Sequence, residues 1–85
     1  MPYNIQIQDR AFKSFKKIPE PHKTLIKRKI DLLKDFTKDM PNIKALQGEY
    51  RGLYRLRIGN YRVLFDVADR NTIIILNVFI RGDGY

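Results

Sequence analysis

The sequence predicts an α+β fold in a single domain, residues 1–85, in which a two-helix hairpin packs on one face of a mostly antiparallel sheet of about four strands. Apolar side chains recur with the period of a helix, about 3.6 residues, in the first half of the chain and alternate with a period of two in the second half. A length of 85 residues suffices for one small core.

The first half of the chain predicts one strand and two helices. Tyr3–Ile7 alternates apolar and polar residues, as a half-buried strand does. Asp9 is a suitable N-cap for a short helix, which Pro19 ends. Pro21 suits the first turn of a second helix that runs to about Lys38. The apolar stripes of the two helices comprise Ala11, Phe12, Phe15 and Ile18, and then Leu25, Ile26, Ile30, Leu33 and Phe36.

The second half predicts a meander of three strands. Asp39–Asn42 breaks the second helix, and Ile43–Arg51 is interpreted as an ordered connection. The strands expected after it are Leu53–Ile58, Tyr61–Val67 and Thr72–Ile80. Gly59 and Asn60 form a two-residue turn of the kind that favours positive φ, and Ala68–Asn71 forms the second turn. The last strand is apolar almost throughout, which favours a central place in the sheet.

The composition excludes several classes of protein. There is no cysteine and only one histidine, His22, so a disulfide framework, a thiolate metal site and a His-rich zinc site are not expected, and no cofactor is. Met1–Arg10 lacks the apolar core of a signal peptide, and Thr72–Ile80 is too short to span a bilayer. We therefore expect a cytoplasmic protein without a membrane partner.

The formal charge of +8, with 17 Lys and Arg against nine Asp and Glu, is the first indication of function. Such an excess favours a polyanionic partner, either nucleic acid or an acidic protein segment. The alternative is that the basic residues only keep the protein soluble. We expect the lysines of the second helix, and His22, to be ordinary surface residues.

The expected hairpin brings arginines together. With Gly59 and Asn60 in the turn, Arg57 lies directly opposite Arg62, on the sheet face turned away from the helices. Like charges opposite one another cost roughly 0.2–1 kcal/mol of stability. The pair therefore indicates an anion-binding site. An ordinary solvated face, on which Arg62 pairs with Asp66, is the alternative.

The third strand is expected to extend this face. If Val67 pairs with Thr72, the side chains on the arginine face are Ile73, Ile75, Asn77, Phe79 and Arg81. Tyr85 follows Arg81 by four residues. Guanidinium groups bind phosphate through paired hydrogen bonds and a tyrosine stacks on an exposed base, so the set favours RNA.

At these residues the sequence resembles the RelE/ParE toxins of bacterial and archaeal type II toxin–antitoxin modules. The resemblance rests on Lys44–Gly48, on Gly52–Phe65, and on the apolar strand that leads to Arg81 and Tyr85. It covers nearly the whole chain and implies the same α+β fold. It also implies an acidic antitoxin that forms a heterocomplex with the toxin and lays a helix or strand across the basic groove.

The superfamily has two branches, and the resemblance favours the one similar to RelE, which cleaves messenger RNA in the ribosomal A site without a metal. By resemblance, Arg55 and Arg57 occupy the two basic positions of the first hairpin strand and Arg62 binds the phosphate. Arg81 takes the leaving-group position and Tyr85 that of the C-terminal tyrosine, so the expected catalytic residues are Arg57, Arg62, Arg81 and Tyr85. The expected phosphate-binding residues are Arg55, Arg57, Arg62, Lys44 and Arg51. The alternative is a ParE-like inhibitor of DNA gyrase, or a degenerate toxin that only binds its antitoxin.

The chain departs from RelE at two of these positions, where RelE has lysines in place of Arg55 and Arg57. An arginine stays protonated in proteins, so neither residue is a suitable general base. Arg57 is instead expected to stabilise charge in the transition state. In this interpretation the tyrosinate of Tyr85 takes the proton, or the ribosome supplies part of the chemistry.

Overall fold

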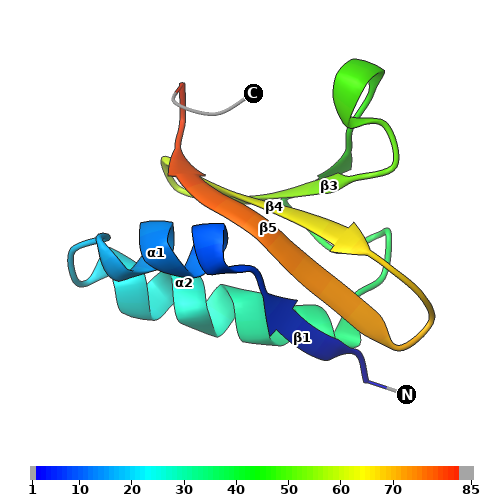
Figure 1. Ribbon diagram of the computed structural model, residues 1–85, viewed down its shortest axis with the longest axis horizontal. Helices are drawn as coiled ribbons and strands as arrows, with labels where there is room; N and C mark the ends of the chain where they lie inside the picture. The colour runs from blue at the N-terminus through cyan, green and yellow to red at the C-terminus, as the bar shows by residue number, and fades with distance from the viewer. Residues whose placement is uncertain (1, 83–85) are drawn as a thin grey trace.

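The computed structural model describes residues 2–82, which form a five-stranded mixed sheet with two helices on one face (Figure 1). The sheet order is β1-β5-β4-β3-β2; β1 is parallel to β5 and every other pair is antiparallel. The elements in chain order are β1 (Asn4–Ile7), α1 (Asp9–Lys16), α2 (His22–Asp31), the 3₁₀-helix η1 (Leu32–Asp35), β2 (Ile43–Ala45), the 3₁₀-helix η2 (Gly48–Tyr50), β3 (Tyr54–Ile58), β4 (Tyr61–Val67) and β5 (Thr72–Ile80). The predicted α+β class is confirmed.

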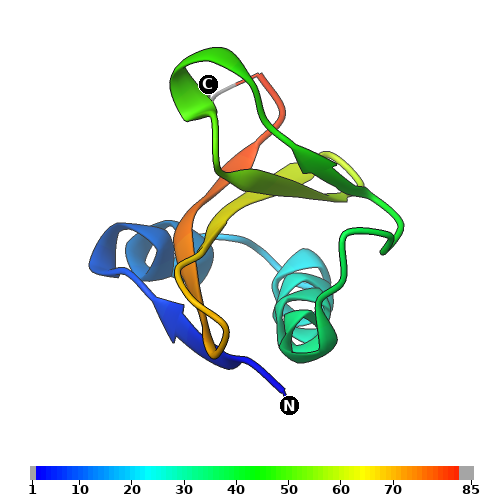
Figure 2. The ribbon, with the colours of Figure 1, turned by 90° about the vertical axis from the view of Figure 1, so that its right-hand side faces the viewer.

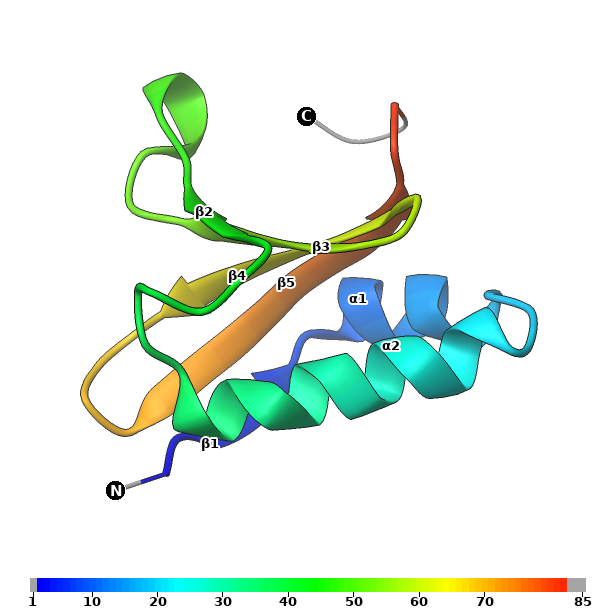
Figure 3. The same cartoon turned by 180° about the vertical axis from the view of Figure 1, so that it is seen from behind.

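The main core lies between the helices and the sheet. Both helices contribute side chains to this core, and the side view shows α1 at the left and α2 nearly end-on at the right (Figure 2). The largest fully buried side chains are Phe65, Ile26, Leu33, Ile73, Ile75 and Val63. On the opposite face, residues 46–53, an arm that includes η2, and residues 81–82 after β5 rise from the sheet (Figure 3). None of the helices in residues 2–82 has the length and apolar character needed to cross a membrane.

The second helix is shorter than predicted. Its α-helical part ends at Asp31 and a single 3₁₀ turn follows, so the prediction that it runs to about Lys38 is wrong. The cause is Phe36, whose backbone is extended (φ −53°, ψ 132°). Its ring packs edge-on against Tyr54 and Phe65, with centroids 5.2 and 5.6 Å away. Leaving the helix at this point lets Phe36 contact the core.

The additional strand, β2, lies in the segment Ile43–Arg51, which the sequence predicts to be an ordered connection. It pairs antiparallel with β3, with Lys44 opposite Arg55. Three residues are too few to show an alternating pattern in the sequence, so the strand is recognised only by its pairing.

Both helices expose residues that were expected to be buried. Phe12 is 48% exposed and Leu25 is 40% exposed, whereas Ala11 and Ile26 are fully buried. The apolar stripes are therefore wider than the area that the sheet covers. The N-cap prediction is shifted by one position, because Asp9 is the first residue of α1 and Gln8 precedes it.

The register between β4 and β5 differs from the predicted one. Val67 lies opposite Ile73 rather than Thr72, and a bulge between Leu64 and Phe65 leaves Leu76 without a partner. A bulge inserts one extra residue and reverses which face the following residues occupy. Ile73 and Ile75 are consequently fully buried in the main core, so their predicted place on the arginine face is wrong.

Glu20 and Thr24 are hydrogen-bonded to each other at the start of α2, and this contact allows a prediction about stability. The carboxylate of Glu20 accepts hydrogen bonds from the hydroxyl of Thr24 (2.8 Å) and from its backbone N–H (2.9 Å). The hydrogen bond from the hydroxyl has the larger effect and that from the backbone N–H the smaller, and together they hold the pKa of Glu20 below its usual value. A carboxyl with a lowered pKa stabilises the fold above its unfolded-state pKa and loses that contribution as the pH falls through its folded-state pKa.

Replacing Thr24 by valine should therefore raise the pKa of Glu20 and lower the melting temperature slightly at pH 6. The difference in melting temperature should be smaller at pH 3 than at pH 6, because the contribution of Glu20 is lost as the pH falls through its folded-state pKa. Thermal unfolding at both pH values checks this. An equal difference at the two values would contradict the assignment to Glu20.

Candidate anion-binding surface

Three arginines lie on the sheet face turned away from the helices, which we call the arginine face: Arg55, Arg57 and Arg62. The structure confirms the predicted hairpin register, with Arg57 opposite Arg62 and Ile58 opposite Tyr61. On the far side of β4, Phe79 lies opposite Arg62. One row of the sheet thus carries two cations beside an aromatic ring.

Arg62 is held by the turn of its own hairpin. Its Nη1 donates hydrogen bonds to the carbonyl oxygens of Gly59 (2.9 Å) and Tyr61 (3.0 Å). Gly59 has a φ of 57°, a conformation that glycine adopts readily. The turn therefore fixes the Arg62 side chain while Arg57, across the strand, is exposed.

Arg81 joins this pair at the same end of the sheet. Its backbone N–H donates a 2.7 Å hydrogen bond to the carbonyl oxygen of Asn60, in the hairpin turn. Its side chain is exposed. The fold therefore brings Arg57, Arg62 and Arg81 to the same end of the sheet, whereas Tyr85, the fourth predicted catalytic residue, lies outside the described residues.

The next row of the arginine face holds Lys44 and Arg55. Lys44 is exposed, and Arg55 is half-buried between Lys44 and Leu64. The Nε of Arg55 is buried and has no hydrogen-bond partner among residues 2–82. Leaving a buried donor unpaired costs about 1–3 kcal/mol. The buried Nε–H of Arg55 therefore lowers the stability of the fold.

Replacing Arg55 by methionine should therefore raise the free energy of unfolding, by about 1 kcal/mol, because the desolvated N–H is removed and the apolar part of the side chain is kept. Urea denaturation of the two proteins measures the difference. Lys44→Met, a matched change at an exposed neighbour, should have a smaller effect. A lower stability of Arg55→Met would show that Arg55 stabilises the sheet.

Arg51 lies apart from these rows, on the arm that includes η2, and is exposed. Two buried leucines of this region were not identified as buried from the sequence. Leu46 and Leu64 are buried but lie outside the main core, and the N–H of Leu46 donates to the carbonyl oxygen of Leu53. Val63, Leu64 and Phe65 form an unbroken apolar run in β4, and such a run is the signal in the sequence that both faces of a strand are buried.

The arrangement defines what the surface can do chemically. Arginine guanidinium groups remain protonated and donate up to five hydrogen bonds in a fixed geometry that matches phosphate. Asp66 is the one carboxylate among β3, β4 and β5, so positive charge predominates on these strands. The described residues can bind a phosphate and stabilise additional negative charge on it, but the arginines cannot accept a proton.

The chain is similar to known proteins over nearly its whole length. Residues 5–85 match the family model described as the ParE toxin of the type II toxin–antitoxin system parDE. The chain is 34% identical over 86 aligned residues to a protein of Methanocaldococcus jannaschii named "Putative toxin RelE1", with 99% of this chain and 94% of that protein covered.

Two solved toxin–antitoxin complexes have the same fold. The RelBE2 complex of Mycobacterium tuberculosis superposes with a TM-score of 0.79 at 26% identity, covering 95% of this chain and 100% of that chain. The archaeal RelE–RelB complex of Pyrococcus horikoshii superposes with a TM-score of 0.75 at 27% identity, covering 99% of this chain and 100% of that chain.

Proposed function

Because the chain belongs to the RelE/ParE superfamily of type II toxins, we propose that it is a ribosome-dependent mRNA endonuclease that cleaves without a metal. The observation that carries the proposal is the gathering of Arg57, Arg62 and Arg81 at one end of an open sheet face. Arginine side chains that start from neighbouring positions at one end of a sheet suit a phosphate that gains negative charge during a reaction. Action on ribosomes places the protein in the cytoplasm.

The proposed reaction is a transesterification within the RNA. The 2′-oxygen of a ribose bonds to the adjacent phosphorus, and the bond from phosphorus to the 5′-oxygen of the next nucleotide breaks. The proton of the 2′-hydroxyl passes to a base, and the departing 5′-oxygen takes up a proton. The products are a 2′,3′-cyclic phosphate and a free 5′-hydroxyl.

The arginines have distinct positions in this scheme. Arg62, fixed by the turn, holds a non-bridging oxygen, and the exposed Arg57 neutralises the charge of the phosphorane-like transition state. Arg81, at the end of β5, stabilises the departing 5′-oxygen. Arg55, Lys44 and Arg51 bind neighbouring phosphates.

Tyr85 is proposed as the group that takes the 2′-hydroxyl proton. Tyr85→Phe should then lower the cleavage rate by about 10²-fold or more while leaving mRNA affinity unchanged, because general acid–base groups contribute roughly 10²–10⁴-fold. Single-turnover cleavage on programmed ribosomes measures both quantities. An unchanged rate would assign proton transfer to the ribosome or favour a non-catalytic toxin.

Inhibition of DNA gyrase is the second candidate, because the matching family model is that of the ParE toxin. The same cationic surface would then bind gyrase and cut nothing. Incubation of the purified protein with translating ribosomes, and in parallel with gyrase and supercoiled DNA, separates the two. Cuts at defined codon positions support the nuclease; intact mRNA together with loss of gyrase activity would refute it.

The partner in the cell is proposed to be an acidic antitoxin, in line with the two solved complexes of similar toxins. With a net charge of +8, the toxin should attract an acidic helix or strand across the arginine face. Such a segment would neutralise the arginines and exclude mRNA. Affinity that falls steeply with salt is the expected result, and a flat salt dependence would contradict this electrostatic account.

A further inference from the structure

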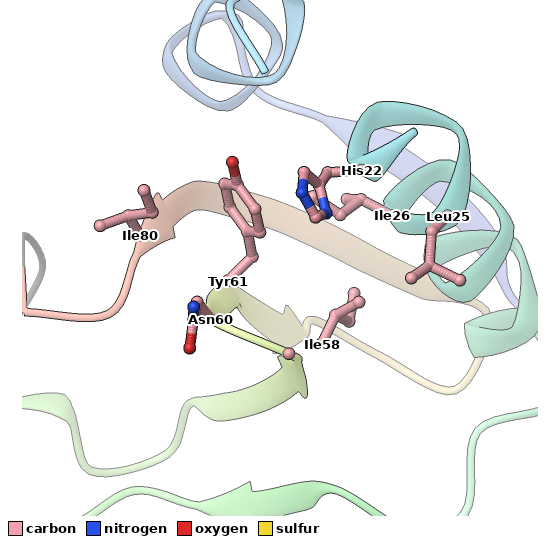
Figure 4. Close-up of a pocket in the computed structure, with 8 residues that line it drawn as sticks. His22, Leu25, Ile26, Ile58, Asn60, Tyr61 and Ile80 are labelled. Atoms are coloured by element: carbon pink, nitrogen blue, oxygen red, sulfur yellow. The ribbon is translucent and has the colours of Figure 1, made fainter. Parts of the chain in front are cut away.

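A pocket of about 370 Å³ lies at the tip of the β3–β4 hairpin, on the side opposite the arginine face (Figure 4). It is formed where the start of α2 approaches the hairpin turn and the end of β5. Its lining residues are His22, Leu25, Ile26, Ile58, Gly59, Asn60, Tyr61 and Ile80. The proposed cleavage reaction uses none of them.

The lining combines aromatic, apolar and amide groups. The rings of His22 and Tyr61 lie with centroids 5.5 Å apart and planes tilted by 43°, so each keeps a face that is not stacked on the other. Leu25 and Ile80 are 40% and 45% exposed. Asn60, in the hairpin turn, adds a polar residue to the lining. A flat aromatic ligand with polar edges fits this chemistry.

The pocket and the arginine face share the hairpin turn. The row Ile58–Tyr61–Ile80 faces the pocket, and the adjacent row Arg57–Arg62–Phe79 faces the other way. Arg81 follows Ile80 directly and is hydrogen-bonded through its backbone to Asn60. Gly59, in the turn between the two faces, has no side chain, and a Cβ built there would meet nothing within 4 Å. A chain held by its phosphates at Arg57, Arg62 and Arg81 can therefore place a neighbouring group in the pocket.

We propose that this pocket binds one nucleobase of the RNA, next to the phosphate held by the three arginines. The inference rests on the proposed function and adds a base subsite to it. An apolar side chain of a protein partner would also fit the aliphatic part of the lining. The base is favoured because Arg57, Arg62 and Arg81 directly follow or precede lining residues in the chain, because no carboxylate of residues 2–82 lines the pocket, and because aromatic rings are the groups that stack on bases.

The test uses an uncleavable 2′-O-methyl RNA hexanucleotide and versions of it that carry one abasic position each. On binding the intact RNA, the ring NMR signals of His22 and Tyr61 should shift together with the side-chain signals of Arg57 and Arg62. One abasic position should weaken binding about tenfold, in the range of base–aromatic stacking, and abolish the ring shifts. Arginine shifts without ring shifts would overturn the base pocket and leave the proposed function standing; no shifts at all would count against both.

A pair of variants supplies the matched control. Leu25→Trp fills the mouth of the pocket, whereas Leu32→Trp makes the same change at a leucine that is 48% exposed and not part of the lining. Leu25→Trp should weaken binding of the intact RNA about tenfold and leave binding of the critical abasic RNA unchanged; Leu32→Trp should affect neither by more than about twofold. If Leu25→Trp weakens antitoxin binding but not RNA binding, the pocket belongs to a protein partner and the proposal fails.

Discussion

Replacing Arg57 by threonine is expected to lower the rate of mRNA cleavage by about 10²–10³-fold and, at the same time, to make the protein more stable. The loss of rate follows because a donor aimed at charge that develops in the transition state contributes about that factor. The gain in stability, roughly 0.2–1 kcal/mol, follows because Arg57 lies directly opposite Arg62 and the two cations repel each other.

Single-turnover cleavage on ribosomes and urea unfolding of the same preparation measure both effects. Arg70→Thr is the matched control: it removes an exposed arginine from the loop between β4 and β5, outside the described arginine rows, and should leave the cleavage rate unchanged. A variant of Arg57 that is less stable and fully active would contradict both parts of the argument.

Arg81→Ala is expected to reduce cleavage by a similar factor, about 10²–10³-fold, with no change in melting temperature. Its side chain is exposed, and the contact that positions it is made by its backbone N–H to Asn60, which alanine retains. Because the proposed role is to stabilise charge on the departing oxygen, Arg81→Lys should restore part of the rate.

A substrate with a better leaving group provides the sharper readout. If Arg81 stabilises the departing 5′-oxygen, replacing that oxygen by sulfur in the RNA should largely remove the defect of Arg81→Ala. It should leave the defect of Arg57→Thr in place. Equal defects on both substrates would show that Arg81 binds RNA and does not assist departure of the leaving group.

The hairpin could be derived from the sequence because its turn has two residues. With Gly59 and Asn60 as the turn, the pairing of Arg57 with Arg62 follows directly, and the alternation of apolar residues assigns the buried face. Local sequence is enough here, since turn length and side-chain period specify the same register.

The departures from the sequence-based expectation all depend on tertiary contacts. The bulge at Leu76 shifts β5 by one residue and buries Ile73 and Ile75, although the run of Ile and Leu in that strand is compatible with either register. The early end of α2 depends on the packing of Phe36 against Tyr54 and Phe65. Neither the bulge nor the early end of α2 can be predicted from the helix or strand propensity of the residues around it.

Part of the candidate site could be predicted from the sequence. The sequence predicted the two arginines of the hairpin and their shared face, and the structure adds the backbone contact from Arg81 to the hairpin turn. The unpaired Nε of Arg55 and the pocket around His22 and Tyr61 arise where separate elements meet. Such features depend on three-dimensional placement, and the sequence order of these residues does not indicate them.

The central claim, that the arginine face cleaves mRNA on the ribosome, is tested most directly by the chemical nature of the RNA ends. Programmed ribosomes are incubated with the purified protein in the presence of a chelator, and the fragments are mapped and their termini identified. The account predicts cuts at A-site codons that leave a 2′,3′-cyclic phosphate and a 5′-hydroxyl, and none with Arg62→Ala. Intact mRNA, or fragments with 5′-phosphate ends, would contradict it.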